Sequence, residues 1–117
     1  MVDAVEFNAK RIRVAQSLQA VVQTLAKELP RTVFNTKDFY FAGGCIYSIW
    51  NDRVPKDYDL FCVSRYRVRK LKEYFKKYKP WCFTTNNAIT FKCSLNNDPD
   101  NIIIVQFITQ YIGPAVQ

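Results

Sequence analysis

The sequence predicts a small α/β (α+β) domain in which helices flank one small mixed sheet. Three features support this class: a long N-terminal segment of helical periodicity, β-prone segments that alternate with further helices, and three β-prone segments in succession near the end. The 117 residues, 49% of them apolar, suffice for one hydrophobic core. We therefore expect a single domain spanning residues 1–117.

Helices and strands alternate in the first half of the chain. Apolar residues recur at helical spacing from Ala4 to Leu29, and Pro30 ends this long N-terminal helix. The segments 39–42 and 58–63 are rich in aromatic and β-branched residues and predict strands, with a short helix over 45–51 between them. The first helix is expected to face the core with Val14, Leu18, Val21, Val22, Leu25 and Leu29.

A strongly basic helix opens the second half, with an apolar stripe of Val68, Leu71, Phe75 and Tyr78. The segments 81–84, 88–91 and 102–108 then predict three closing strands, with a turn over 96–100. The segment 111–117 has Gly-Pro followed by good helix formers, which is typical of the opening of another helix. The sequence is therefore either a minimal protein or a fragment that lacks a C-terminal extension.

The net charge of +7 lies entirely in residues 65–79, because positive and negative side chains balance in the rest of the chain. Such a patch attracts phosphate-bearing partners, whereas the alternative is a solvated helix face that keeps the protein soluble. The row opposite the apolar stripe, which we expect to bind nucleic acid, consists of Arg65, Arg69, Lys72 and Lys76, followed by Lys79.

The chain contains no histidine, and its four cysteines are widely spaced, which excludes the usual zinc sites and leaves oxygen ligands for any metal. Without histidine, Ser48 and Ser64 also lack the base that a serine nucleophile needs. No signal peptide or membrane-spanning run is present, so we expect a cytoplasmic protein that does not contact a membrane. Four reduced, mostly buried thiols are predicted: Cys45, Cys62, Cys82 and Cys93.

Two short motifs can carry chemistry. Asp57 and Asp59 are two residues apart at a predicted strand, so both carboxylates point to one face, a geometry suited to a divalent metal. A solvated or turn-capping pair would have the same spacing. Gly43 and Gly44 follow a strand and open a helix, where a phosphate can approach backbone N–H groups, although a tight turn without a ligand uses the same residues.

Together these motifs resemble the nucleotidyltransferase (polymerase beta-like) superfamily. Gly43-Gly44, twelve intervening residues and Asp57-Tyr58-Asp59 match its pattern of two small residues, a short helix and an Asp-x-Asp strand. The segments 42–46 and 55–60 are especially similar to the head domain of CCA-adding enzymes and bacterial poly(A) polymerases. The segments 87–91 and 104–108 are similar to small phage-encoded nucleotidyltransferase-like proteins. The resemblance covers about residues 39–114 and implies a minimal nucleotidyltransferase fold.

The resemblance also implies roles for particular residues. Gly43 and Gly44 would hold a nucleoside triphosphate, with Arg53 and Lys56 as further candidates for nucleotide contacts. Asp57 and Asp59 would be catalytic and would bind Mg²⁺ or Mn²⁺. Active members usually carry a third carboxylate on a later strand, but no Asp or Glu occurs from residue 101 to 117. Gln106 stands about where that metal ligand is expected.

Three functions follow as hypotheses. The first is a Mg²⁺-dependent nucleotidyltransferase that moves a nucleoside monophosphate from a triphosphate to a hydroxyl of RNA, such as tRNA, or of another acceptor. The second is a catalytically degenerate protein of the same fold, of the phage-encoded kind, that binds a nucleotide, a nucleic acid or a host protein without turnover. The third is a plain nucleic-acid-binding module that acts through the basic helix alone.

Overall fold

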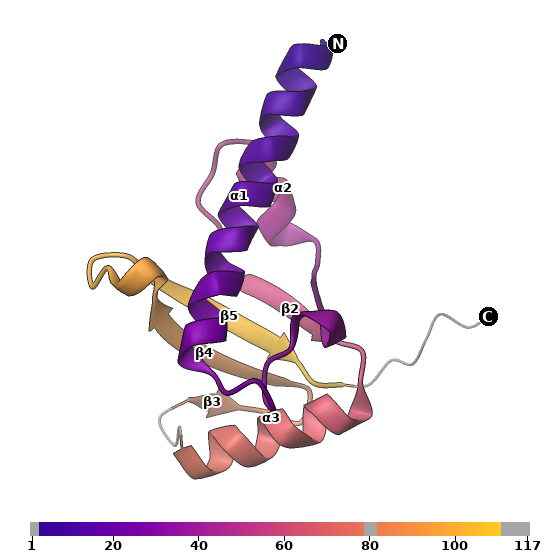
Figure 1. The fold of residues 1–117 in the computed structure, drawn as a ribbon, viewed down its shortest axis with the longest axis vertical. Helices are drawn as coiled ribbons and strands as arrows, with labels where there is room; N and C mark the ends of the chain where they lie inside the picture. Colours follow the sequence, from indigo (N-terminus) through magenta and orange to yellow (C-terminus); the bar gives the residue numbers. More distant parts are fainter. Residues whose placement is uncertain (1–2, 79–81, 111–117) are drawn as a thin grey trace, which may run out of the picture.

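The computed structural model describes residues 3–78 and 82–110, which form three helices and a five-stranded mixed sheet (Figure 1). The α/β class and the order of elements are as the sequence predicts. The expected helix opening at 111–117 lies outside the described residues. The elements are α1 (Ala4–Glu28), β1 (Phe39–Phe41), α2 (Gly44–Trp50), β2 (Tyr58–Cys62), α3 (Arg65–Tyr78), β3 (Phe83–Thr84), β4 (Ala88–Ser94) and β5 (Ile102–Ile108), with 3₁₀ turns η1 (Thr36–Asp38) and η2 (Leu95–Asn97).

The sheet has the strand order β1-β2-β5-β4-β3. The central strands β2 and β5 are parallel, and the other neighbouring strands are antiparallel. One row of register partners crosses four strands, from Asp59 through Gln106 and Thr90 to Phe83. Directly opposed residues of neighbouring strands point to the same face, so these four side chains share one face of the sheet.

All three helices pack against the opposite face of the sheet. Leu60, Phe107 and Ile89 are register partners on that face, and all three are fully buried. They belong to a single core cluster to which α1 contributes Val21 and Leu25, α2 contributes Ile49, and α3 contributes Leu71 and Phe75. The face without a helix, called the open face, carries partly buried or exposed residues, which include Asp59, Phe61, Thr90, Lys92, Ile104, Gln106 and Ile108.

Helix α1 lies across the sheet, and its first turns extend past the sheet (Figure 1). It begins at Asp3, whose side chain accepts a hydrogen bond from the backbone N–H of Glu6 at 2.7 Å, and it ends before Pro30. Its buried residues, Val21, Thr24 and Leu25, all lie in its second half. Three other residues predicted to face the core are partly buried against it: Val14, Leu18 and Val22.

Helix α3 buries Val68, Leu71 and Phe75 as predicted, but the prediction for Tyr78 is wrong. Tyr78 is 57% exposed, because it is the last residue of the helix and its ring packs on Tyr74, 5.2 Å away, rather than entering the core. Tyr74 is partly buried and packs against the core instead. The exposed cations of this helix are Arg65, Arg69, Lys72, Lys76 and Lys77.

The remaining differences from the sequence prediction concern element ends. Strand β4 continues to Ser94 because Lys92, Cys93 and Ser94 also pair with β5. Strand β3 contains only Phe83 and Thr84. The four cysteines are free thiols, three of them buried, as expected. In the part of the chain that the structure describes, no helix is both long enough and apolar enough to cross a membrane.

Candidate nucleotide and metal site

The glycine pair forms a tight turn between β1 and α2. Gly43 has φ 57° and ψ −106°, a backbone conformation that side-chain-bearing residues rarely adopt, and it caps the N-terminus of α2. The turn lies against β2, because the N–H of Ala42 donates to the carbonyl of Asp59 at 3.2 Å. The double glycine and the aspartate motif are therefore brought together, as the resemblance requires.

Gly44 differs from Gly43 in what a side chain there would meet. Its φ lies outside the left-handed region, and a Cβ at this position would have no neighbour within 4 Å. A side chain at Gly44 would therefore not crowd the turn itself. The space beside Gly44 is open, because this residue faces a cavity rather than protein atoms.

The carboxylate of Asp59 lies in an unfavourable environment. Its Oδ1 atom is enclosed and has no hydrogen-bond partner. Burial raises the pKa of Asp59, and the negative charge of Asp57 raises it further. The two carboxylates therefore lie close enough to repel each other. Asp57 itself is exposed and lies in the loop directly before β2, so of the two aspartates only Asp59 is on the strand.

Gln106 is the register partner of Asp59 on the neighbouring parallel strand. The structure thus places the amide on the open face beside the carboxylate, where the resemblance expects a third acid. Thr90 of β4 is the next residue in this row. Neither of these side chains carries a charge that would compensate Asp59 or compete with it for a cation.

The oxygen donors at this site fit a divalent cation. Mg²⁺ prefers oxygen ligands and is commonly held by one or two carboxylates together with waters and substrate phosphates. The enclosed Asp59 Oδ1 without a partner is the observation that fits, because a bound cation would satisfy it. Within residues 3–78 and 82–110 no group of three or more His, Cys, Asp or Glu side chains could hold a metal. The residues that would hold one here are Asp57, Asp59 and Gln106.

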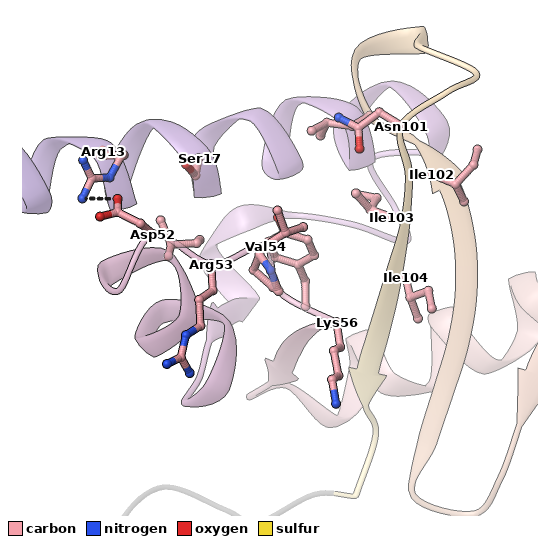
Figure 2. A pocket seen from close by; sticks show the side chains of 14 residues that line it. Arg13, Ser17, Asp52, Arg53, Val54, Lys56, Asn101, Ile102, Ile103 and Ile104 are labelled. Atoms are coloured by element: carbon pink, nitrogen blue, oxygen red, sulfur yellow. Dashed lines mark ion pairs between the residues drawn. The ribbon is translucent and has the colours of Figure 1, made fainter.

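A cavity of about 340 Å³, called the loop cavity, adjoins Asp57. Arg53 and Lys56 point to the same side of their loop, away from α1 (Figure 2). Two cations and one carboxylate around this cavity favour an anionic ligand, and its size is that of a small ligand pocket. The loop cavity is lined by Gly44, Ser48, Arg53, Val54, Pro55, Lys56 and Asp57.

Two contacts fix the loop that carries Arg53 and Lys56. The N–H of Arg53 donates to the carbonyl of Ser48 at 2.8 Å, and Asp52, with φ 59°, forms an ion pair of 2.8 Å with Arg13 of α1 (Figure 2). A second cavity of about 470 Å³ also contacts this loop. It extends toward α1 and β5, as Figure 2 shows, and its lining mixes aliphatic residues with charged and polar ones.

Sequence inspection missed Ser48 as a member of this site. Ser48 lies four residues after Gly44, and residues at this spacing share one helix face, so this signal was present in the sequence. Thr90 was missed because its place depends on the register between β4 and β5, which no local pattern specifies.

The predicted row of cations on α3 does not form one surface, and its last member, Lys79, lies outside the described residues. Arg69 lies 5.6 Å from the centre of the Tyr66 ring, beside Lys70 at 5.5 Å, which is not part of the predicted row. Lys72 and Lys76 instead line a third cavity of about 670 Å³ beside β3. Arg65 is the first residue of α3, at the other end of the helix from this cavity.

The fold and site define a small α/β protein with a phosphate-suited turn and paired carboxylates beside a cationic cavity. A family model described as Gabija anti-defense 2 family protein matches residues 13–117. Because this match covers most of the chain, the protein belongs to that family. No curated protein and no solved structure matches this chain.

Proposed function

We propose that this protein is a Mg²⁺-dependent nucleotidyltransferase that transfers a nucleoside monophosphate from a triphosphate to a nucleic acid hydroxyl. One observation carries the proposal: the enclosed carboxylate oxygen of Asp59 has no hydrogen-bond partner and is close enough to Asp57 for their charges to repel. Asp57 lines the loop cavity together with Gly44, and the backbone carbonyl of Asp59 accepts a hydrogen bond from Ala42, which precedes the glycine pair. A purely structural aspartate would have hydrogen-bond partners for a buried oxygen.

Each residue of the site has a proposed role that follows from its chemistry. Gly43 gives the turn its conformation, and Gly44 leaves room for phosphates beside the backbone. Arg53 and Lys56 attract the triphosphate into the loop cavity, and Ser48 offers it a hydroxyl donor. Asp57 and Asp59, with the amide oxygen of Gln106, would hold Mg²⁺. When bound, Mg²⁺ neutralises charge on the phosphates and lowers the pKa of the attacking hydroxyl.

In the transfer, the acceptor oxygen forms a bond to the α-phosphorus, and the bond from that phosphorus to the bridging oxygen breaks. Pyrophosphate leaves toward Arg53 and Lys56, whose charges stabilise it. The hydroxyl proton passes to a carboxylate oxygen of the aspartate pair, because the amide of Gln106 is not basic. The chain thus supplies positioning and electrostatic stabilisation rather than a covalent intermediate.

The direct test is incubation of the purified protein with α-phosphate-labelled triphosphates, Mg²⁺ or Mn²⁺, and total RNA. We expect label to appear in RNA and to be lost with Asp57→Asn or Asp59→Asn. An Asp100→Asn variant is the matched control, since Asp100 is exposed in the distant turn before β5. Equal labelling by Asp59→Asn and the parent protein would refute the assignment.

Gln106 supports a second candidate function, binding of a nucleotide without turnover. A neutral amide in the position of a third acid holds a metal less strongly than a carboxylate does. Calorimetry separates the two candidates. Binding of a triphosphate that depends on Gly44 and Lys56, without transfer of label to any RNA, would establish the binding function and exclude the enzyme.

The family name gives the proposed biological setting, which is action against the Gabija defence. If the aspartate pair carries this action, cells that contain Gabija should lose their protection when they express the parent protein but keep it with Asp57→Asn or Asp59→Asn. Phage plaque counts measure the difference. Equal loss of protection with the variants would separate the anti-defense action from the aspartate pair.

A further inference from the structure

The third cavity lies at the edge of the sheet and is called the edge groove. Its volume is about 670 Å³, and Figure 1 shows the two elements that form it, α3 and the neighbouring strand β3. The proposed nucleotidyl transfer does not use any residue that lines it. The lining consists of Lys72, Phe75, Lys76, Cys82, Phe83, Thr84, Thr85 and Asn86.

The charge of the edge groove is positive and uncompensated. Lys72 and Lys76 are four residues apart on α3, so both ammonium groups lie on one face of the helix. The groove lining contains no carboxylate, and among the described residues neither lysine forms an ion pair. The acid nearest in sequence, Glu73, pairs with Lys70 instead. Two adjacent free cations are suited to successive phosphates of a nucleic acid strand.

Phe83 adds a feature that phosphate binding alone does not require. Its side chain is 68% exposed on the short edge strand β3, although phenylalanine is normally buried. Thr84, Thr85 and Asn86 follow it along the groove and are exposed. Phe83 lies at the sheet edge with its side chain on the open face, whereas Lys72 and Lys76 lie on α3 at the other side of the same edge. A single strand that passes around this edge can stack a base on the ring and place neighbouring phosphates at the two cations. A duplex cannot use the ring, because its bases are already stacked and paired.

The edge groove also connects to the aspartate pair. Phe83, Thr90, Gln106 and Asp59 are successive register partners across the open face. Three strand spacings of about 4.8 Å separate the first from the last, a path of roughly 14 Å. Stacked nucleotides rise by about 3.4 Å each, so roughly four of them span this path. Lys92, exposed on the same face of β4, flanks the path with one more cation.

We propose that the edge groove binds single-stranded nucleic acid, with a base stacked on Phe83 and phosphates at Lys72 and Lys76. The strand then crosses the open face, and its terminal hydroxyl reaches Asp59. The proposal of strand binding depends on the edge groove alone, whereas the proposal that the strand delivers its hydroxyl rests on the proposed nucleotidyl transfer.

Binding is tested by fluorescence anisotropy with a labelled 12-nucleotide oligouridine and a 12-base-pair RNA duplex, in EDTA and without nucleotide. We expect the single strand to bind at least about tenfold more tightly than the duplex. Phe83→Leu should weaken single-strand binding about five- to tenfold without changing its salt dependence, because it removes stacking and no charge. Equal affinity for strand and duplex, or an unchanged affinity of Phe83→Leu, would overturn the proposal.

The lysines give an independent signature in the same assay. Lys72→Gln with Lys76→Gln should lower the slope of log affinity against log salt by about 0.7 for each lysine removed. The matched controls are Tyr47→Leu, an exposed aromatic residue of α2, and Lys27→Gln with Lys37→Gln, which lie outside the groove. An unchanged salt slope in the Lys72 and Lys76 variant would also overturn the proposal. Melting curves of all variants show that the fold is kept.

Delivery of the hydroxyl is tested through the KM for a single-stranded acceptor in the label-transfer assay. We expect Phe83→Leu to raise this KM while kcat stays close to that of the parent. If transfer occurs and its KM does not change, the acceptor path is wrong and the nucleotidyl transfer stands. If the strand binds as expected and no transfer occurs with any acceptor, the groove stands and the proposed enzyme function fails.

Discussion

Asp59 of β2 and Gln106 of β5 lie directly opposite each other on adjacent parallel strands, and the enclosed oxygen of Asp59 still has no hydrogen-bond partner. The amide is thus beside the carboxylate without satisfying it. An unpaired carboxylate oxygen in a partly buried position lowers the stability of the folded protein. A cation bound at the proposed metal site would remove this loss of stability.

The first prediction concerns how the loss of stability caused by the Asp59 carboxylate depends on pH. The pKa of Asp59 is raised in the folded protein, so the charge penalty is absent below the unfolded value of about 4 and grows as the pH rises through the folded pKa. In EDTA, Asp59→Asn should therefore melt about 2–5 °C above the parent at pH 7, and the difference should vanish below about pH 4. Calorimetry across this pH range measures it.

Asp57→Asn provides the comparison for Asp59→Asn. It removes only the smaller cause of the pKa shift of Asp59, so we expect a smaller rise in melting temperature over the same pH range. Both substitutions should abolish stabilisation by Mg²⁺. If Asp59→Asn melts well below the parent at pH 7, the carboxylate has a structural partner and the site is not a metal site.

The second prediction concerns Gln106→Asp. A third carboxylate beside Asp59 adds repulsion, so in EDTA the variant should melt below the parent at pH 7. Added Mg²⁺ should then raise its melting temperature by more than it raises that of the parent, because a charged oxygen replaces a neutral one. Gln106→Asn, which keeps the amide, should show no such gain. A Gln106→Asp variant that is destabilised and insensitive to Mg²⁺ would place Gln106 outside any metal site.

Much of the fold could be predicted from the sequence because its helices and strands have strong periodic patterns. The core residues of α1 and α3 occur at helical spacing, and β5 was located to its exact ends by its β-branched run and the preceding turn. Tyr78 was placed wrongly because periodicity does not show where a helix passes beyond the core. The strand order and the register of β5 between β2 and β4 depend on long-range pairing that local patterns do not encode.

The candidate site could be predicted only where its residues are close in sequence. The glycine turn and the aspartate pair form one local motif, so their proximity follows from a short helix and a loop. The edge groove joins α3 to β3, and the importance of Phe83 depends on its exposure, which the sequence does not give. An exposed phenylalanine in a β-prone segment has the same local pattern as a buried one.

The third prediction separates the two glycines. Gly43→Ala forces a side chain into a left-handed conformation and should destabilise the protein by about 1–3 kcal/mol. Gly44→Ala meets no neighbour within 4 Å and opens a helix, so it should leave stability unchanged or raise it by about 0.5–1 kcal/mol. Urea denaturation measures both.

The same pair tests the loop cavity. Gly44→Val should abolish binding of a triphosphate in calorimetry while the protein stays folded, because the side chain occupies the space in which phosphates approach the backbone. If Gly44→Val binds a triphosphate as tightly as the parent does, the glycine turn has only a conformational role.

The fourth prediction distinguishes structural from binding cations on α3. The guanidinium of Arg67 lies 3.0 Å from Asp38 and also donates to the carbonyls of Arg31 and Thr32, and its side chain is only 12% exposed. Arg67→Gln removes the charge partner of Asp38 and leaves these carbonyls without a donor. We expect a loss of stability of about 1–3 kcal/mol.

Arg69→Gln is the matched control for Arg67→Gln, because Arg69 lies two residues further along the same helix and is exposed. Its stability should stay within about 0.5 kcal/mol of the parent. Arg67→Lys should fall between the two, since lysine keeps the charge but cannot reproduce the planar set of donors. Urea denaturation of the three variants gives the order of stability. If Arg67→Gln and Arg69→Gln lose the same amount of stability, the contacts of Arg67 do not stabilise the packing of α3 against the loop before β1. Arg67 would then be available for ligand binding like the exposed cations of the helix.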